Sequence, residues 1–137
     1  MPAPIPPMTS DLADAIRHVL RHGHTIDITT IGRRSGEPRR IEMTFHSFDG
    51  HLYISGIPNP ERTRAWLHNL RADPAFTFHL KQLLQADLPA TAREITAEAE
   101  RRAVFARIAK VWNRDVETMV AHSPLVEVTI EGFAPAG

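Results

Sequence analysis

Four arginines gather on one short stretch of this chain, and their side chains are well suited to binding an anion. They are Arg33, Arg34, Arg39 and Arg40, in a protein of 137 residues whose 16 basic and 16 acidic side chains leave no formal net charge at pH 7. The planar guanidinium group donates hydrogen bonds in a geometry that matches phosphate and carboxylate. The cluster therefore predicts a specific anionic ligand, and the alternative is a solvated turn that is basic without a ligand.

The residues between these arginines predict a loop that a ligand can approach closely. Gly32 and Gly36 allow positive φ, Pro38 restricts the backbone that follows, and the Ser35 hydroxyl can donate to an oxyanion. Apolar residues alternate with polar ones on both sides, at Ile26, Ile28, Ile41, Met43 and Phe45. This alternation is typical of strands, so the arginines are expected on a hairpin loop at the rim of a sheet.

The positions of the arginines fit a larger pattern of strands and helices. Strands are predicted at 24–31, 40–48, 51–55, 76–80, 84–94 and 125–130, with Asp49-Gly50 as a hairpin turn. Helices are predicted from Thr9 or Ser10 to Gly23, from Asn59-Pro60 to Arg71, from 97 to 111 with Thr96 as its cap, and around 115–120. Six or so antiparallel strands with short helices favour a small barrel, because closure removes exposed edges, and an orthogonal sandwich is the alternative.

Two of these helices show apolar faces that should pack on the sheet. The faces comprise Leu12, Ile16, Val19 and Leu20 in the first helix, and Ala103, Val104, Ile108 and Val111 in the third.

Length and composition limit the class of protein. We expect a flexible proline-rich arm at residues 1–8 and a single domain at 9–137. The absence of cysteine excludes disulfides, thiolate zinc sites and a cysteine nucleophile. The first residues lack the basic and apolar segments of a signal peptide, and no stretch reaches transmembrane length, so a cytoplasmic protein without stable membrane insertion is expected. One basic turn in a neutral chain also argues against a nucleic-acid partner.

Two segments together resemble a known family. Thr29–Gly36 with Pro38-Arg39, followed by Ala65–Pro74, is similar to the paired motifs of the deazaflavin (F420)-dependent nitroreductase family, within the split β-barrel flavin and deazaflavin oxidoreductases. The resemblance extends from about His24 to the last strand. It implies a mainly β fold with helices, a split antiparallel β-barrel of the FMN-binding type, a homodimer, and coenzyme F420 as the cofactor. FMN in the same fold is the alternative cofactor.

The resemblance also assigns cofactor-binding residues. Arg33, Arg34, Ser35, Gly36 and Arg39 match the family's loop for the phosphate and oligoglutamate tail of F420. Trp66 and Asn69 match its Trp-x-x-Asn motif near the deazaflavin ring, and Ser55 and Gly56 end the third strand where the family's backbone approaches that ring. From the residues alone, the alternative for Trp66 is a core aromatic, packed with Leu67 and Leu70.

The chain departs from the family pattern at three places. Ile41-Glu42-Met43 stands where the family often has Pro-Leu. The loop before Trp66 is rich in proline instead of glycine and lysine, so Arg62 or Arg64 is expected to replace the lysine charge. Tyr53 is the only tyrosine, whereas characterised nitroreductases of this type present tyrosines from their late helices to the substrate.

The implied function is hydride transfer from reduced F420 to a small electrophilic acceptor such as a quinone, an enone or a nitro compound. The alternative is a non-catalytic split-barrel protein that binds a lipid or another apolar or anionic ligand. His46, His51, His68 and His122 can each carry a proton near neutral pH, but the sequence assigns none of them as catalytic. His18 and His22 have a spacing that allows metal binding, but without further ligands in the pattern no metal site is predicted.

Overall fold

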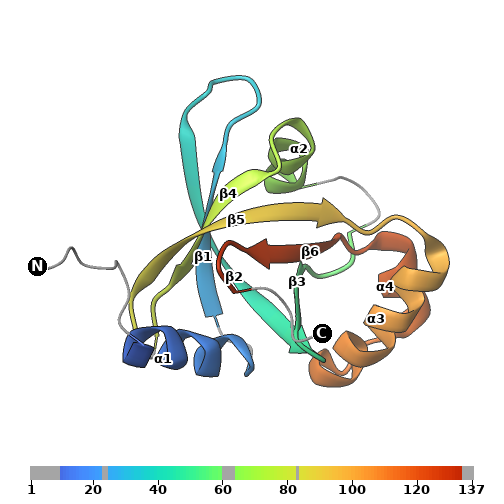
Figure 1. The fold of residues 1–137 in the computed structure, drawn as a ribbon. Coiled ribbons are helices and arrows are strands. Elements are labelled where there is room, and N and C mark those ends of the chain that lie inside the picture. Colours follow the sequence, from blue (N-terminus) through green and yellow to red (C-terminus); the bar gives the residue numbers. More distant parts are fainter. Residues whose placement is uncertain (1–9, 23–24, 60–63, 83, 134–137) are drawn as a thin grey trace, which may run out of the picture.

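Six antiparallel strands close into a barrel in the order β1-β2-β3-β6-β5-β4 (Figure 1). The computed structural model describes residues 10–22, 25–59, 64–82 and 84–133, so the arm expected at 1–8 and the helix end expected at Gly23 lie outside the described residues. The strands are β1 Thr25–Ile31, β2 Pro38–Phe48, β3 His51–Ser55, β4 Ala75–Leu80, β5 Ala86–Glu94 and β6 Leu125–Ile130. The helices are α1 Ser10–Leu20, α2 Ala65–Ala72, α3 Glu98–Trp112 and α4 Val116–His122.

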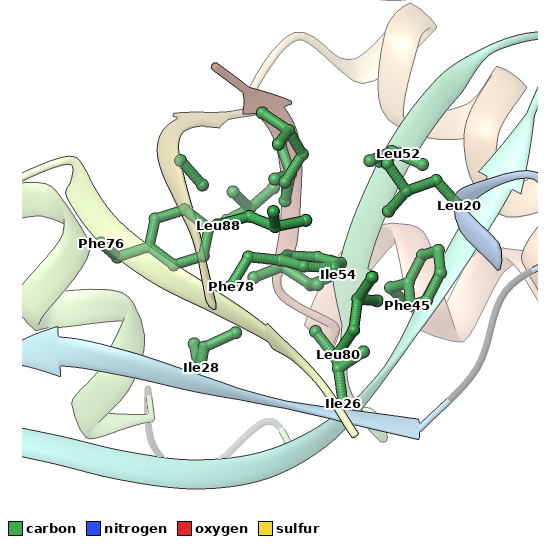
Figure 2. Close-up of a cluster of buried hydrophobic side chains, with 14 of the residues drawn as sticks. Leu20, Ile26, Ile28, Phe45, Leu52, Ile54, Phe76, Phe78, Leu80 and Leu88 are labelled. Atoms are coloured by element: carbon green, nitrogen blue, oxygen red, sulfur yellow. The ribbon is translucent and has the colours of Figure 1, made fainter. Parts of the chain in front are cut away.

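Closure of the barrel confirms the predicted fold class and rules out the orthogonal sandwich. β1 pairs with β2 along its whole length and with β4 through Asp27, Ile28 and Thr29, so it has no free edge over these residues. Alternation decides what fills the barrel: Ile26 and Ile28 are fully buried between half-buried neighbours. Figure 2 shows how Phe45 and Phe78 meet in this core, with ring centroids 5.3 Å apart in an edge-to-face contact.

The helices cover different parts of the barrel. α1 lies at the end of the barrel opposite the tip of the β1–β2 hairpin (Figure 1), and Ile16, Val19 and Leu20 join the barrel core. Leu12, predicted on the same face, is 37% exposed because it sits in the first turn of α1, one turn before the buried residues begin.

α3 and α4 form a second, smaller core beside β3 and β6. Val104, Phe105, Ile108 and Ala109 of α3 pack there against Met119 of α4. The predicted stripe was wrong at Ala103, which is exposed, and at Val111, which is 63% exposed. The buried stripe runs through adjacent pairs at 104–105 and 108–109, and this turns Ala103 and Val111 to solvent.

The turns and helix ends hold one confirmation and two corrections. Asp49 and Gly50 both have positive φ, of 55° and 81°, as a two-residue hairpin turn requires. α2 begins at Ala65 after an extended Arg64, so the predicted start at Asn59-Pro60 was wrong; residues 60–63 lie outside the described part. α3 begins after Ala97, which makes no side-chain cap, so Thr96 is not the cap.

Arg101 ties α3 to the end of α4. Its guanidinium donates to the carbonyl oxygens of Ile95 at 2.9 Å, Val120 at 2.8 Å and Ser123 at 2.6 Å. Burial of this group lowers the pKa of Arg101. Val120 lies in the last turn of α4, Ser123 is the C-cap of α4 and Ile95 follows β5, so one side chain fixes the path of the chain towards β6.

Candidate functional site

The basic turn closes the β1–β2 hairpin next to α2 (Figure 1). Gly32 N–H donates to the Glu37 carbonyl and Gly36 N–H to the Gly32 carbonyl, each at 2.8 Å. Gly36 has φ of 71°, a conformation that favours glycine. The Ser35 hydroxyl oxygen accepts from Glu37 N–H at 3.1 Å, and it occupies the space that a Cβ on Gly32 would need. Both glycines are therefore required by the shape of the turn.

Asn69 fastens this turn to α2. Its Oδ1 accepts from the Arg33 backbone N–H at 3.1 Å, and its Nδ2 donates to Thr30 Oγ1 at 3.1 Å. Asn69 and Thr30 are 5% and 1% exposed. The buried amide thus holds the start of the turn against the helix that carries Trp66.

A first cavity of about 880 Å³ lies between the basic turn and α2. It brings together six of the nine predicted cofactor-binding residues: Arg33, Arg34, Ser35, Arg39, Trp66 and Asn69. Gly36 does not line it and contributes through the turn. Its size is in the range of cofactor-binding cavities.

A second cavity of about 520 Å³ adjoins the first. Ile41, Arg64 and Trp66 line both, so the two cavities meet at these side chains. The two remaining predicted residues, Ser55 and Gly56, lie on the second cavity. The predicted set is therefore divided between two neighbouring spaces, with Trp66 on their common boundary.

Ser55, Gly56 and Trp66 are each held tightly. Ser55 is buried, and its hydroxyl donates to the Pro124 carbonyl at 2.5 Å. A Cβ on Gly56 would lie 2.8 Å from the Arg64 guanidinium, which donates to the Ile57 carbonyl. Trp66 is 9% exposed and belongs to the barrel core as well as to both cavity walls. The core interpretation of Trp66 is confirmed, and its predicted role in cofactor binding stays a prediction.

The charges of the cavity arginines are not neutralised within the described chain. Most other cations are paired with carboxylates: Arg17, Arg40, Arg71, Lys81, Arg93, Arg102 and Arg107. Arg33, Arg34 and Arg39 make no side-chain hydrogen bond or ion pair with any described residue. Three guanidinium groups thus face the first cavity with their donors available to an anion.

Sequence reasoning missed part of the second cavity. Trp112 and Arg114 line it from the end of α3, far along the chain from either motif. Arg64, expected only as a substitute for a lysine charge, borders both cavities. The sequence carries no local signal for Trp112 or Arg114, because their position depends on how α3 packs.

The histidines lie in different environments. His46 is 4% exposed, its Nε2 has no hydrogen-bond partner among the described residues, and burial lowers its pKa to about 4. His51 Nδ1 lies 2.7 Å from a Glu127 carboxylate oxygen, His68 lines the first cavity and His122 is exposed. Within the described ranges, no three His, Asp or Glu side chains form a group that could hold a metal ion.

Comparison with known proteins fits this site. The model of the F420H(2)-dependent quinone reductase family matches residues 11–131. The chain belongs to this family. It is an oxidoreductase that uses coenzyme F420, which confirms the expected class and cofactor. The chain has no match among the curated proteins.

Solved structures share the fold at low sequence identity. An F420-H2-dependent reductase is 21% identical with a TM-score of 0.56, over 77% of this chain and 93% of that one. A conserved hypothetical protein from Mycobacterium tuberculosis is 18% identical with a TM-score of 0.65, over 90% and 81%. A protein described as a domain-swapped dimer is 17% identical with a TM-score of 0.59, over 85% and 96%. None of the described helices is long and apolar enough to cross a membrane.

Proposed function

We propose that this protein transfers a hydride from reduced F420 to a quinone, with enones and nitro compounds as related electrophilic acceptors. Reduced F420 supplies the hydride when bound, and a quinone that takes up one hydride and one proton becomes a hydroquinone. Membership of the quinone reductase family supports this acceptor class. The observation that carries the proposal is that Arg33, Arg34 and Arg39, unpaired within the described chain, line the first cavity directly beside a second cavity whose walls include Ile41, Met43, Ile57 and two tryptophans.

The arginine turn fits the anionic part of F420, its phosphate and oligoglutamate tail. Arg33, Arg34 and Arg39 would bind these groups, because no described carboxylate is bonded to their guanidinium groups. Ser35 Oγ accepts a bond within the turn and keeps its own hydrogen for an oxyanion. Each hydrogen bond to a charged group contributes about 1.5 to 3 kcal/mol.

The ring end of the cofactor would be oriented by Trp66, since its indole borders both cavities and is fixed by the core. Asn69 acts as a positioning residue, because its amide holds the Arg33 backbone. Gly56 leaves room for Arg64 at the common boundary, and Ser55 anchors the end of β3 through Pro124. These residues shape the site and exclude water from the boundary between the cavities.

We also propose that the protein works as a homodimer. Ile57, on the wall of the second cavity, is 54% exposed, and Ile31, at the end of β1 next to the basic turn, is 39% exposed. A partner subunit over this region would cover both side chains and close the cavities. The similarity to a protein described as a domain-swapped dimer supports this arrangement. Sedimentation at micromolar concentration should give a dimer, and a monomer that binds F420 fully would contradict it.

The function is tested first by binding. F420 and FMN are titrated separately into the purified protein and followed by fluorescence. F420 should bind more tightly, and the double variant Arg33→Ala, Arg39→Ala should lose F420 binding without a change in melting temperature. The variant Arg40→Ala is the matched control, because Arg40 is paired with Asp27 outside the cavities.

Turnover is tested with the same preparations. Wild-type protein with reduced F420 should reduce menadione, and oxidised F420 should appear in equal amount. Binding of F420 without reduction of menadione, an enone or a nitroaromatic would contradict the proposed reaction, even if the cofactor site is correct.

A further inference from the structure

The end of α3 forms a wall of the second cavity that the cofactor-binding residues do not account for. Trp112 is the last residue of α3, and Asn113 follows in the left-handed conformation with φ of 52° and ψ of 55°. The backbone N–H of Arg114 then turns back to donate to the Ala109 carbonyl at 2.9 Å. This turn brings Trp112 and Arg114 to the cavity together.

Trp112 is held in place by an uncharged neighbour. Its ring makes an edge-to-face contact with the His46 ring, with centroids 4.9 Å apart and planes at 65°. His46 is 4% exposed and belongs to the barrel strand β2, so Trp112 packs against this strand. The indole that lines the cavity therefore rests on a buried support.

Arg114 brings a positive charge that is not neutralised in the described chain. It is exposed and makes no side-chain hydrogen bond or ion pair with any described residue. The acidic residue on the same cavity, Glu42, is already bound to Lys81, whose Nζ lies 2.5 Å from Glu42 Oε2. Lys81 thus removes the one described carboxylate on this cavity that could compete for Arg114.

The remaining walls combine apolar side chains with Thr44, Ser55 and Arg64. Ile41, Met43 and Ile57 line the cavity together with the two tryptophans. A planar ring fits between such side chains, and a volume of about 520 Å³ is ample for two fused rings. The arrangement pairs a flat apolar slot with one available guanidinium.

We propose that the second cavity selects a planar, two-ring acceptor that carries a carboxylate, with the rings along Trp112 and the carboxylate on Arg114. This inference rests on the proposed function and names the substrate class of its acceptor site. The carboxylate takes no part in the redox step: the quinone ring gains the hydride and one proton, and F420 is released in oxidised form. Arg114 is a specificity residue that binds a group remote from the reacting carbonyl.

The test compares two ligands that differ in charge alone. Binding of 1-hydroxy-2-naphthoate and of its neutral amide, 1-hydroxy-2-naphthamide, is measured by calorimetry on the protein without F420. The wild type should bind the carboxylate at least about tenfold more tightly, as expected for a charge-assisted hydrogen bond. Arg114→Gln should abolish this preference, and Arg114→Lys should restore part of it.

The matched control is Lys110→Gln. Lys110 lies one turn before Arg114, has no partner in the described chain and does not line either cavity. Its loss should leave the preference unchanged. Equal binding of the two ligands by the wild type, or an equal loss in Lys110→Gln and Arg114→Gln, would overturn the inference.

Kinetics separate this inference from the proposed function. In wild-type protein, the naphthoate should inhibit menadione reduction competitively and more strongly than the amide, and Arg114→Gln should remove the difference, whereas Lys110→Gln should retain both the difference and kcat for menadione. If the wild type reduces menadione but the naphthoate and the amide inhibit equally, only the role of Arg114 is overturned. Failure to reduce menadione with F420 bound contradicts the function, while the calorimetric preference still tests the anion site.

Discussion

Arg39 and Arg40 are adjacent in the sequence, but within the described chain only Arg40 is paired with a carboxylate. Arg39 faces the first cavity and has no ion-pair partner in the described chain, whereas Arg40 Nε donates to Asp27 at 2.9 Å. Alternation along β2 explains the difference, because successive side chains point to opposite faces of a strand. Arg40, on the outside of the barrel, is neutralised by Asp27, and Arg39, at the cavity, keeps its donors available.

A second cation on the outer face, Lys81, is also paired with carboxylates. Lys81 bridges Asp27 and Glu42, at 2.7 and 2.5 Å. Hydrogen bonds from Lys81 lower the pKa of Asp27, and the same bonds with Asp27 and Glu42 raise the pKa of Lys81. The chain can therefore be neutral overall and still have a positively charged cavity, because carboxylates such as Asp27 and Glu42 are paired with cations outside the first cavity.

The largest expected effect lies at Arg101, a cation whose donors are used entirely within the fold. Arg101→Ala leaves the carbonyls of Ile95, Val120 and Ser123 without their donor, and unfolding should become easier by about 3 kcal/mol. Chemical denaturation measures this, with Arg114→Ala as the control that should change little. An equal loss of unfolding free energy in both variants would show that the hydrogen bonds of Arg101 contribute no more to stability than Arg114, which has no partner in the described chain.

A change of similar size in the free energy of unfolding is expected from the protonation of His46, a buried group without a charged partner. Its native pKa is about 4, and the ordinary value is 6.5. Below pH 6.5 the unfolded chain takes up this proton and the native chain does not, so stability falls as the pH drops from 6.5 towards 4, by about 3 kcal/mol in total. Denaturation curves across this range should lose this slope in His46→Phe. An identical slope in both proteins would show that other groups cause it.

The comparison between Arg39 and Arg40 can be tested directly with F420. Arg39→Ala should weaken F420 binding by about 1.5 to 3 kcal/mol, and Arg40→Ala should not. Added salt should weaken wild-type binding too, because exposed charges are screened. Fluorescence titrations at two salt concentrations measure both effects; equal sensitivity of the two variants would remove the special status of the cavity arginines.

The smallest effect concerns stability at the outer face. Arg40→Ala breaks an ion pair in which Arg40 is half exposed, so its free energy of unfolding should fall by less than about 1 kcal/mol. A larger loss, measured by denaturation, would mean that the outer charge network supports the barrel instead of only balancing its charge.

Local patterns in the sequence were sufficient for the strands and the basic turn. The hairpin could be predicted because its signals span only a few residues. They are the period-two alternation around Ile26 and Ile28 and the glycines of the turn. The start of α2 could not, because Asn59-Pro60 is a good helix signal on its own. Trp112 and Arg114 reach the site only through the packing of α3, which no local periodicity encodes.

The bonds of Asn69 join two segments that are distant in the sequence into one mechanical unit. Because this amide binds both the Arg33 backbone and Thr30, a displacement of the arginine turn must drag α2 and its indole with it. Transfer of the turn to another barrel would therefore have to include α2, since the loop alone would lack the Asn69 hydrogen bonds that hold it in place.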